Sequence, residues 1–219
     1  MAISADFPYP RRYNSLRLSG HDYAQTNSLY FITIDAFETR PLFGDITLAK
    51  KTLSSLLHPN LSAIIRVHAF TLMPEHLHLL AGVCKPGRRL SASLGSFKSF
   101  STRAYWKRSR EIAESGQVVL PGRSVARSKP EEAKQILAAL IDWRATLLPE
   151  AVAIKNWPNV KPEIFLTKRL WHRSFHEHII RNEMDLRETL EYIAKNPVKR
   201  GYVSRPQFYP FTGFNIEYV

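Results

Sequence analysis

The stretch Met73-Pro74-Glu75-His76-Leu77-His78-Leu79-Leu80 decides the fold, because it divides into a turn and a strand. Its first three residues separate two apolar runs, 63–72 and 76–83, and are few enough to join neighbouring antiparallel strands. Successive side chains of a strand point to opposite faces, so His76 and His78 share one face and the neighbouring leucines share the other. The pattern predicts a sheet with two imidazoles opposite an apolar layer.

Periodicity outside this hairpin predicts one more strand and three helices, at residues 29–34 for the strand and at 46–57, 90–110 and 183–195 for the helices. Asn182 stands at the N-cap position of the last helix, and Pro197 is expected to end it. Residues 171–180 resume an ordered apolar pattern ahead of that helix. Residues 201–219 are expected to form a tail that folds back over the core, and no internal repeat is visible.

Residues 109–168 interrupt this regular pattern. Prolines surround a single predicted helix, 131–147, whose apolar side chains must pack on another element but suggest no chemistry. A chain of 219 residues suits one domain, or one domain with a large insertion. We therefore interpret residues 1–219 as one domain with an insertion at about 109–168.

Basic residues outnumber acidic ones, 31 to 19, which leaves a net charge of +12 and an isoelectric point near 10.0. Residues 85–129 hold eleven basic and two acidic residues, so nine of the twelve excess charges lie there. Aromatic side chains are interleaved with these charges, at Phe97, Phe100, Tyr105 and Trp106. The pattern is typical of a nucleic-acid face, and the alternative is an ordinary solvated helix.

Composition and the N-terminal residues limit the cellular setting. No apolar stretch approaches the roughly 18 to 20 residues that a membrane-spanning helix needs, and Asp6, Pro8 and Pro10 stand where a signal peptide would be apolar. We expect a cytoplasmic, nucleoid-associated protein without a membrane partner. The single cysteine, Cys84, excludes an internal disulfide and any multi-cysteine zinc site.

Two histidine pairs are candidate metal ligands. Imidazoles two residues apart on a strand, such as His76 and His78, are placed to bind one divalent ion, although a metal needs more than two ligands. The rival pair is His176 and His178, next to His172, which lacks a clean alternation with apolar residues. Packing, hydrogen bonding or phosphate contacts remain open for this second group.

The predicted helix 183–195 carries a tyrosine beside its buried stripe. Leu186, Leu190 and Ile193 mark that stripe, while Tyr192 and Asn196 are four residues apart along its flank. A side chain on such a flank can reach a cleft, but a packing role for Tyr192 fits the spacing as well. Pro197 disfavours helical geometry at Asn196, so the spatial relation of these two side chains stays open.

The combination resembles the REP-associated tyrosine transposases, which belong to the insertion-sequence-type single-tyrosine transposases of the HUH single-strand DNA endonuclease superfamily. The matching blocks are Leu16-Arg17-Leu18 to Asp22-Tyr23, Tyr30-Phe31-Ile32-Thr33 with Pro41-Leu42-Phe43-Gly44, Met73 to His78, Phe97-Lys98-Ser99 to Tyr105, and Leu170-Trp171-His172-Arg173 through Glu177-His178-Ile179-Ile180-Arg181 to Tyr192-Ile193-Ala194-Lys195-Asn196-Pro197-Val198. Two departures are the long segment 109–168 and His172, which stands where glutamine is usual.

The resemblance implies an α+β fold, a ferredoxin-like antiparallel β-sheet with helices packed on it. It also implies that His76, His78 and Asn196 bind a divalent metal ion, Mg2+ or Mn2+, opposite Tyr192 as the nucleophile. The implied activity is that of a metal-dependent single-stranded DNA endonuclease and strand transferase, a transposase. It would act on hairpin-bearing DNA, such as repetitive extragenic palindromes, through a 5′-phosphotyrosine intermediate.

Basic residues inside or near the matching blocks are the expected DNA contacts, namely Lys98, Arg103, Lys107, Arg108, Arg173, Arg181 and Lys199. No phosphate-binding glycine loop is present in the sequence, so no small-molecule cofactor is expected. Two other classes remain open: a non-cleaving protein that binds hairpin or single-stranded nucleic acid, and a metal-dependent hydrolase that uses water. Whether the protein is a monomer or a homodimer is undecided.

Overall fold

The computed structural model describes residues 21–26, 28–115, 154–166 and 169–215. Within these residues a single antiparallel sheet has the strand order β4-β1-β3-β2-β5. The strands are β1 Leu29–Asp35, β2 Ile65–Leu72, β3 His76–Val83, β4 His176–Ile179 and β5 Thr212–Phe214. The helices are α1 Ile46–Leu56, α2 Pro59–Ser62, α3 Leu90–Glu114 and α5 Glu183–Lys199, with short 3-10 turns at Phe37–Thr39, Leu42–Gly44, Pro162–Leu166 and Pro206–Phe208.

Along the chain, the first four strands and the two longer helices between them follow in the order β1-α1-β2-β3-α3-β4. In the sheet these four strands lie side by side as β4-β1-β3-β2. This is the ferredoxin-like arrangement, extended by α5 and by β5, which pairs with the outer edge of β2. The α+β fold implied by the sequence is therefore confirmed. The hairpin is confirmed as well, because β2 and β3 pair around Met73-Pro74-Glu75.

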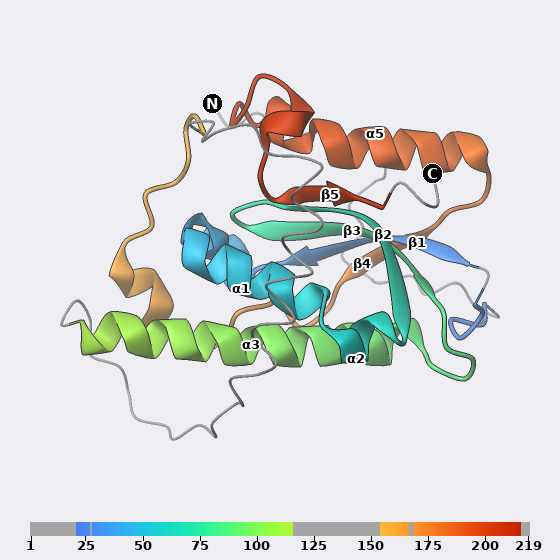
Figure 1. Ribbon diagram of the computed structural model, residues 1–219, viewed down its shortest axis with the longest axis horizontal. Coiled ribbons are helices and arrows are strands. Elements are labelled where there is room, and N and C mark those ends of the chain that lie inside the picture. Colours follow the sequence, from blue (N-terminus) through green and yellow to red (C-terminus); the bar gives the residue numbers. More distant parts are fainter. Residues whose placement is uncertain (1–20, 27, 116–153, 167–168, 216–219) are drawn as a thin grey trace.

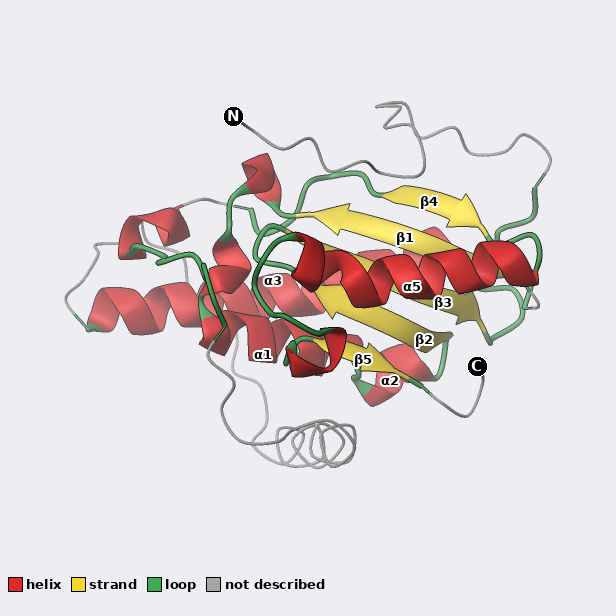
Figure 2. Cartoon of the chain, turned by 90° about the horizontal axis from the view of Figure 1, so that it is seen from above, coloured by secondary structure: helices red, strands yellow, loops and turns green. Residues whose placement is uncertain are grey.

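Helices cover both faces of the sheet (Figure 1). Strand residues such as Tyr30, Ile32 and Leu79 pack with α1 and α3 in the larger core, which buries most of the apolar side chains. On the other face a smaller cluster joins Phe31 and Leu80 to α5. Seen from above, α5 lies across the middle of the sheet (Figure 2). The central strand β3 is buried along its whole length, so its side chains contribute to both layers.

Two helices, α3 and α5, are longer than expected, and α3 is described first. Helix α3 continues four residues past Arg110 to Glu114, because Lys51 and Glu111 form an ion pair at 2.8 Å that joins α1 to α3. A tertiary contact of this kind is not visible in local periodicity. Pro59 does not simply end α1, since it opens the short helix α2 at a position that proline favours.

Helix α5 does not stop before Pro197, and the expectation that this proline ends it is wrong. The helix runs to Lys199, the amide of Arg200 donates to the carbonyl oxygen of Asn196, and Gly201 follows at φ 72°. A proline near the end of a helix removes one hydrogen bond but leaves the backbone free to continue, and glycine adopts the left-handed conformation that ends it. Tyr192 and Asn196 therefore do lie on consecutive helical turns. Asn182 caps the helix as expected, accepting from the amide of Asp185.

The described end of the predicted insertion, residues 154–166, packs on the core. Trp157 donates its indole N–H to the carbonyl oxygen of Gly44 at 2.8 Å, and a Cβ on that glycine would collide with Val160. The tail folds back as expected, because β5 joins the sheet and the Tyr209 hydroxyl donates to the carbonyl of Leu72. The predicted helix 131–147 lies outside the described residues. Among the helices of the described part, none is long and apolar enough to cross a membrane.

Candidate active site

The sheet face beneath α5 carries a row of polar side chains. Cross-strand register aligns five residues across the whole sheet, in the order His176, Thr33, His78, Thr71 and Thr212. Residues opposite each other on paired strands point to the same face. The Thr33 hydroxyl hydrogen-bonds Nδ1 of His78 at 2.9 Å, and the Thr212 hydroxyl donates to that of Thr71 at 2.7 Å. The row therefore forms a hydrogen-bonded polar strip under α5.

His76 and His78 lie together on this face, as the alternation of β3 predicts. Their ring centroids are 4.4 Å apart, and the two residues are only 8% and 2% exposed. Thr33 holds the His78 ring through Nδ1, and a histidine is commonly oriented for metal binding by a hydrogen bond to its second nitrogen. This pair is therefore buried, close and rigidly held.

Glu75 connects the histidines to the end of α5. Its Oε1 is 2.9 Å from Nη2 of Arg200 and 3.6 Å from Nδ1 of His76. Burial raises the pKa of the Glu75 carboxyl, and the positive charge of Arg200 acts in the opposite direction. The first residue after α5 is thus tied to the residue that precedes β3.

Tyr192 on α5 faces the histidines. Its ring centroid is 5.2 Å from that of His78 and 5.7 Å from that of Phe31, both in edge-on contact. The ammonium group of Lys199 lies 5.3 Å from the centre of the same ring. The tyrosine is only partly buried, so its position next to the imidazoles is compatible with access by a ligand.

Asn196 lies over β3 between two observed contacts. Tyr192, Asn196 and Arg200 are spaced four residues apart, and side chains at this spacing lie along one side of a helix. The outer two contact His78 and Glu75, so Asn196 faces the segment between them, and it is 6% exposed. Asn196 therefore lies, buried, on the side of α5 that contacts this part of the sheet.

The residues present fit a divalent cation by the chemistry of their donors. Two imidazoles and one carboxamide oxygen are ligands that several first-row metals accept. In the described part of the chain, no group of three or more His, Cys, Asp or Glu side chains is close enough to hold a metal. The third ligand that the resemblance implies is Asn196, which lies on the side of α5 that contacts this part of the sheet.

The rival histidine pair is divided between two carboxylates. His178 Nε2 binds both carboxylate oxygens of Asp185 at 2.8 and 2.9 Å, while His176 Nε2 lies 3.9 Å from Oδ2 of Asp35. The two rings thus serve different partners, one on α5 and one on β1. His172 stands apart from both, with its Nδ1 hydrogen-bonded to the Ser174 hydroxyl at 2.9 Å.

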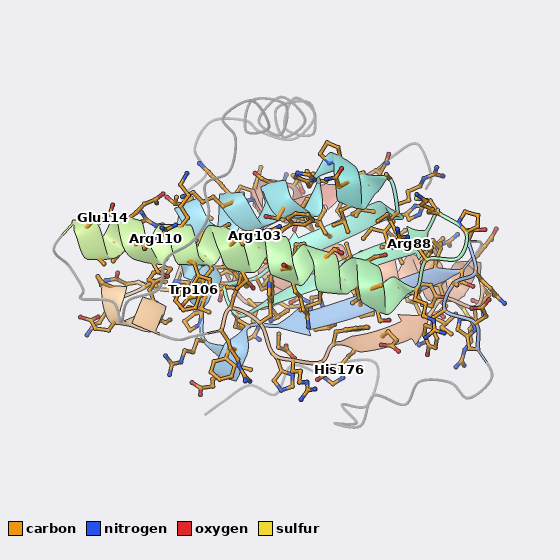
Figure 3. The ribbon with its side chains drawn as sticks, turned by 90° about the horizontal axis from the view of Figure 1, so that it is seen from below. Arg88, Arg103, Trp106, Arg110, Glu114 and His176 are labelled. Atoms are coloured by element: carbon orange, nitrogen blue, oxygen red, sulfur yellow. The ribbon has the colours of Figure 1, made fainter. Side chains whose placement is uncertain are left out.

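The basic residues of α3 lie on the opposite side of the sheet from Tyr192. Figure 3, seen from the side of the molecule opposite α5, shows Arg103 and Arg110 on α3 and Arg88 in the loop just before this helix. Arg103 is exposed and stacks on Phe100 at 4.5 Å, and Lys107 is also exposed. These side chains are accessible to a polyanion, but at a surface separate from the histidines.

Two of the expected DNA contacts on α3 have protein partners. The ammonium of Lys98 donates to the carbonyl oxygens of His172, Arg173 and Ser174 at 2.9, 3.3 and 2.9 Å, so it fixes that loop. Burial lowers the pKa of Lys98 to about 8. Arg108 forms a bidentate ion pair with Asp45 at 2.8 to 3.1 Å. The structure thus gives both residues a role in joining elements of the fold.

Arg173, Arg181 and Lys199 are exposed. Arg181 lies at the start of α5, where its backbone N–H donates to Asp185, and Lys199 lies at the other end of the helix. Trp171, in the same motif as Arg173, is a core residue that packs on Phe43 and donates to the Ser101 hydroxyl. The motif therefore combines a buried anchor with an exposed cation.

Sequence reasoning missed three contributors to the site, Thr33, Asp185 and Arg200. Thr33 stands in one of the matching blocks, but its contact with His78 could not be predicted, because it depends on cross-strand register. Asp185 stands three residues after the N-cap, where an acidic side chain is normally explained by the helix dipole alone. Arg200 follows the expected end of the helix, and only the extension through Pro197 brings it to Glu75.

The ferredoxin-like sheet and the contact between Tyr192 and His78 agree with the fold and the arrangement that the resemblance of the sequence motifs implies. No family model matches the chain. The chain is 44% identical over 48 residues to the REP-associated tyrosine transposase of Escherichia coli K12, a match that covers 22% of this chain and 29% of that protein. The similarity to this group is thus confirmed, over a short stretch.

Matches that cover most of the chain have lower sequence identity. An uncharacterized protein of Haemophilus influenzae is 24% identical over 193 residues, which covers 84% of this chain and 87% of that protein. Among solved structures, a REP-associated tyrosine transposase bound to a REP hairpin aligns over 88% of this chain and 79% of its own, with a TM-score of 0.48 and 19% identity.

Proposed function

We propose that the chain is a metal-dependent single-stranded DNA endonuclease and strand transferase that acts on hairpin-bearing DNA, such as repetitive extragenic palindromes. The observation that carries the proposal is the contact between the rings of Tyr192 and His78, 5.2 Å apart, in a site where His76 adjoins His78. A phenol in contact with one of two adjacent buried imidazoles is compatible with a tyrosine nucleophile that a metal ion assists. The name of the Escherichia coli relative supports the same class of activity.

In this proposal Tyr192 attacks the scissile phosphodiester. A bond forms between its phenol oxygen and phosphorus, and the bond from phosphorus to the 3′ oxygen breaks. The phenol gives up its proton to solvent, and the leaving 3′ oxygen takes one up from solvent, so the number of protons balances. The products are a 5′-phosphotyrosine and a free 3′-hydroxyl, which can later attack in reverse and so rejoin or transfer the strand. The covalent link keeps the energy of the phosphodiester, so no nucleotide cofactor is required.

Ionising the nucleophile is the main energetic obstacle. A free tyrosine has a pKa near 10, so its phenolate at pH 7 costs about 4 kcal/mol. The ammonium of Lys199, 5.3 Å from the centre of the ring, favours the phenolate, but this lysine is exposed, so water and salt screen its charge and it supplies about 1 kcal/mol or less. A divalent ion bound by His76, His78 and Asn196 would act as a Lewis acid on the phosphate. Lys199 alone therefore falls short of the required stabilisation.

The exposed basic residues support binding of a polyanion. Arg181 and Lys199 at the two ends of α5 flank Tyr192 and are placed to hold a strand across the helix, whereas Arg103 and Lys107 lie on the far face. In our proposal the cleaved strand follows α5. Contacts to α3 would then come from another part of the same DNA, such as the hairpin stem.

The test is incubation of the protein with hairpin-bearing single-stranded DNA and Mg2+ or Mn2+, followed by denaturing gel electrophoresis. We expect a covalent protein–DNA band that is lost on chelation of the metal and in His76→Ala. The matched control is His172→Ala, a histidine outside the site whose loss should leave the band in place. DNA binding at full affinity without any covalent band would contradict the proposal and favour a non-cleaving binding protein. Free 5′-phosphate ends without an adduct would favour hydrolysis by water.

A further inference from the structure

Strand β4 is bonded to the first turn of α5 through one side-chain pair. Nε2 of His178 lies 2.8 and 2.9 Å from the two carboxylate oxygens of Asp185, whose side chain is 13% exposed. The same carboxylate accepts from the backbone N–H of Arg181 at 3.1 Å, and the Asp185 amide donates to the capping side chain of Asn182. Asp185 is thus held from three directions, and only His178 comes from the sheet.

The position of Asp185 on the helix relates it to the tyrosine. Seven residues separate Asp185 from Tyr192, and at about 100° per residue they point within about 20° of each other. His178 is the cross-strand partner of Phe31, and the ring of Phe31 touches that of Tyr192 at 5.7 Å. The contact between His178 and Asp185 therefore lies on the same side of α5 as the contact between Tyr192 and the sheet.

A small rotation of α5 would displace the phenol considerably. A side chain reaches about 5 to 6 Å from the helix axis, so a turn of about 20° moves its tip by about 2 Å. A displacement of about 1 Å in a catalytic group can lower a rate about 100-fold. A bond that prevents this rotation therefore acts directly on the distance between Tyr192 and the imidazoles.

We propose that the His178–Asp185 pair is a positioning device that sets the rotation of α5 and thereby holds Tyr192 against His78. The inference rests on the proposed function, because Tyr192 is there the nucleophile. At the other end of the helix, Arg200 binds Glu75 at 2.9 Å. Glu75 adjoins His76, so removing the Arg200–Glu75 contact would disturb the site itself. The His178–Asp185 contact can be removed without changing a neighbour of His76 or His78 in the sequence.

Three substitutions at one position separate positioning from simple loss of a contact. His178→Ala removes the bond to Asp185. His178→Gln presents an amide N–H at about the reach of Nε2, and His178→Asn presents the same group one carbon shorter. Glutamine should therefore restore the contact and asparagine should not. The control is His58→Ala, which removes a helix cap and a ring stacked on Phe100, and so lowers stability on the opposite side of the sheet.

Two readouts apply to every variant. The first is the single-turnover rate of covalent adduct formation at saturating hairpin DNA, with DNA affinity measured separately. The second is the nuclear Overhauser effect between the rings of Tyr192 and Phe31 in the protein without DNA. We expect His178→Ala and His178→Asn to lower the rate about 10- to 100-fold and to weaken the ring contact, with affinity within about threefold. His178→Gln and His58→Ala should stay within about threefold of the parent rate.

A wild-type rate and an intact ring contact in His178→Ala would overturn the inference. An equal loss of rate in His58→Ala would overturn it as well, because the effect would then follow from stability alone. If His178→Ala does not fold, the comparison of glutamine with asparagine decides, and equal behaviour of the two would refute the positioning role. If the parent protein forms no adduct, the proposed function fails. The ring contact then decides alone, since its persistence in all variants would exclude positioning.

Discussion

Replacing Tyr192 by phenylalanine separates chemistry from packing. The change removes one oxygen and keeps the ring, so the edge-on contacts with His78 and Phe31 and the cation above the ring should all persist. For a half-buried side chain without a lost cavity, the free energy of unfolding should change by about 0.5 kcal/mol or less. The covalent adduct should nevertheless disappear completely, because no other oxygen takes the place of the nucleophile.

Tyr105→Phe is the matched control, because it should show the reverse behaviour. Tyr105 is fully buried on α3, and its hydroxyl donates to the carbonyl oxygen of Phe165 at 3.0 Å. Loss of that hydroxyl leaves a buried acceptor unsatisfied, at a cost of about 1 to 3 kcal/mol. For a chain of this size the melting temperature should fall by about 2 to 4 °C per kcal/mol. Adduct formation at a temperature where the variant is folded should persist.

The assay combines thermal unfolding with the covalent gel band, and peptide mapping of the trapped DNA identifies the attacked residue. The reasoning predicts loss of the band with unchanged stability for Tyr192→Phe, and the opposite for Tyr105→Phe. A band that survives in Tyr192→Phe would refute the assignment of the nucleophile. A DNA label mapped to Tyr105 would refute it equally.

Further predictions concern the metal, the DNA surface and a buried lysine. His78→Ala should abolish the adduct while DNA affinity stays within a few fold by filter binding, because phosphate contacts dominate affinity. Arg103→Glu and Lys107→Glu should each reduce the slope of log affinity against log salt by roughly 0.7 to 0.9, the values for one phosphate of a single strand and of a duplex stem. Arg108→Glu should instead lower stability by about 1 to 3 kcal/mol in urea, because it breaks a bidentate ion pair; unchanged stability would contradict this. The pKa of Lys98 is about 8 in the folded protein and about 10.4 in the unfolded chain. Between these two pH values the unfolded chain binds more protons than the folded protein. The free energy of unfolding should therefore increase as the pH rises from about 8 to about 10.4. Lys98→Met should lack that gain, and identical pH profiles of the two proteins would exclude it.

Local pattern was sufficient where one residue interacts with its near neighbours in sequence. The alternation around His76 and His78 predicted the central strand, the turn at Met73-Pro74-Glu75 predicted the hairpin, and Asn182 predicted the start of α5. These features depend on backbone geometry and side-chain direction, which have fixed periods of about 2 and 3.6 residues. The resemblance of the motifs then indicated the ferredoxin-like order of the strands.

Local pattern failed at the ends of helices. Periodicity ended the helix of residues 90–110 too early, because an ion pair with α1 supports its last turn. The rule that proline ends a helix misplaced the end of α5, because the missing hydrogen bond of Pro197 falls in the last turn and costs little there. In both cases contacts with distant parts of the chain outweighed the local preference.

The number and position of the basic residues are known from the sequence, but it could not predict which of them contact other protein groups and which can contact DNA. Lys98 and Arg108 belong to the basic segment, yet their charges are bound by three carbonyl groups and by Asp45. Sequence spacing contains no information about which face of the sheet a helix covers. Only the tertiary structure shows that α3 and α5 lie on opposite faces.

The sequence by itself determined the strand and helix that carry the candidate residues, since His76, His78, Tyr192 and Asn196 each follow from local spacing and motif. Only the tertiary structure decided that Tyr192 contacts His78 and that Asn196 lies on the same side of α5. More than a hundred residues separate the histidines from the tyrosine, and their contact depends on sheet register and on the rotation of α5. Both are set by distant side chains such as Thr33 and Asp185, because a helix can be placed over a sheet in many orientations until specific contacts select one.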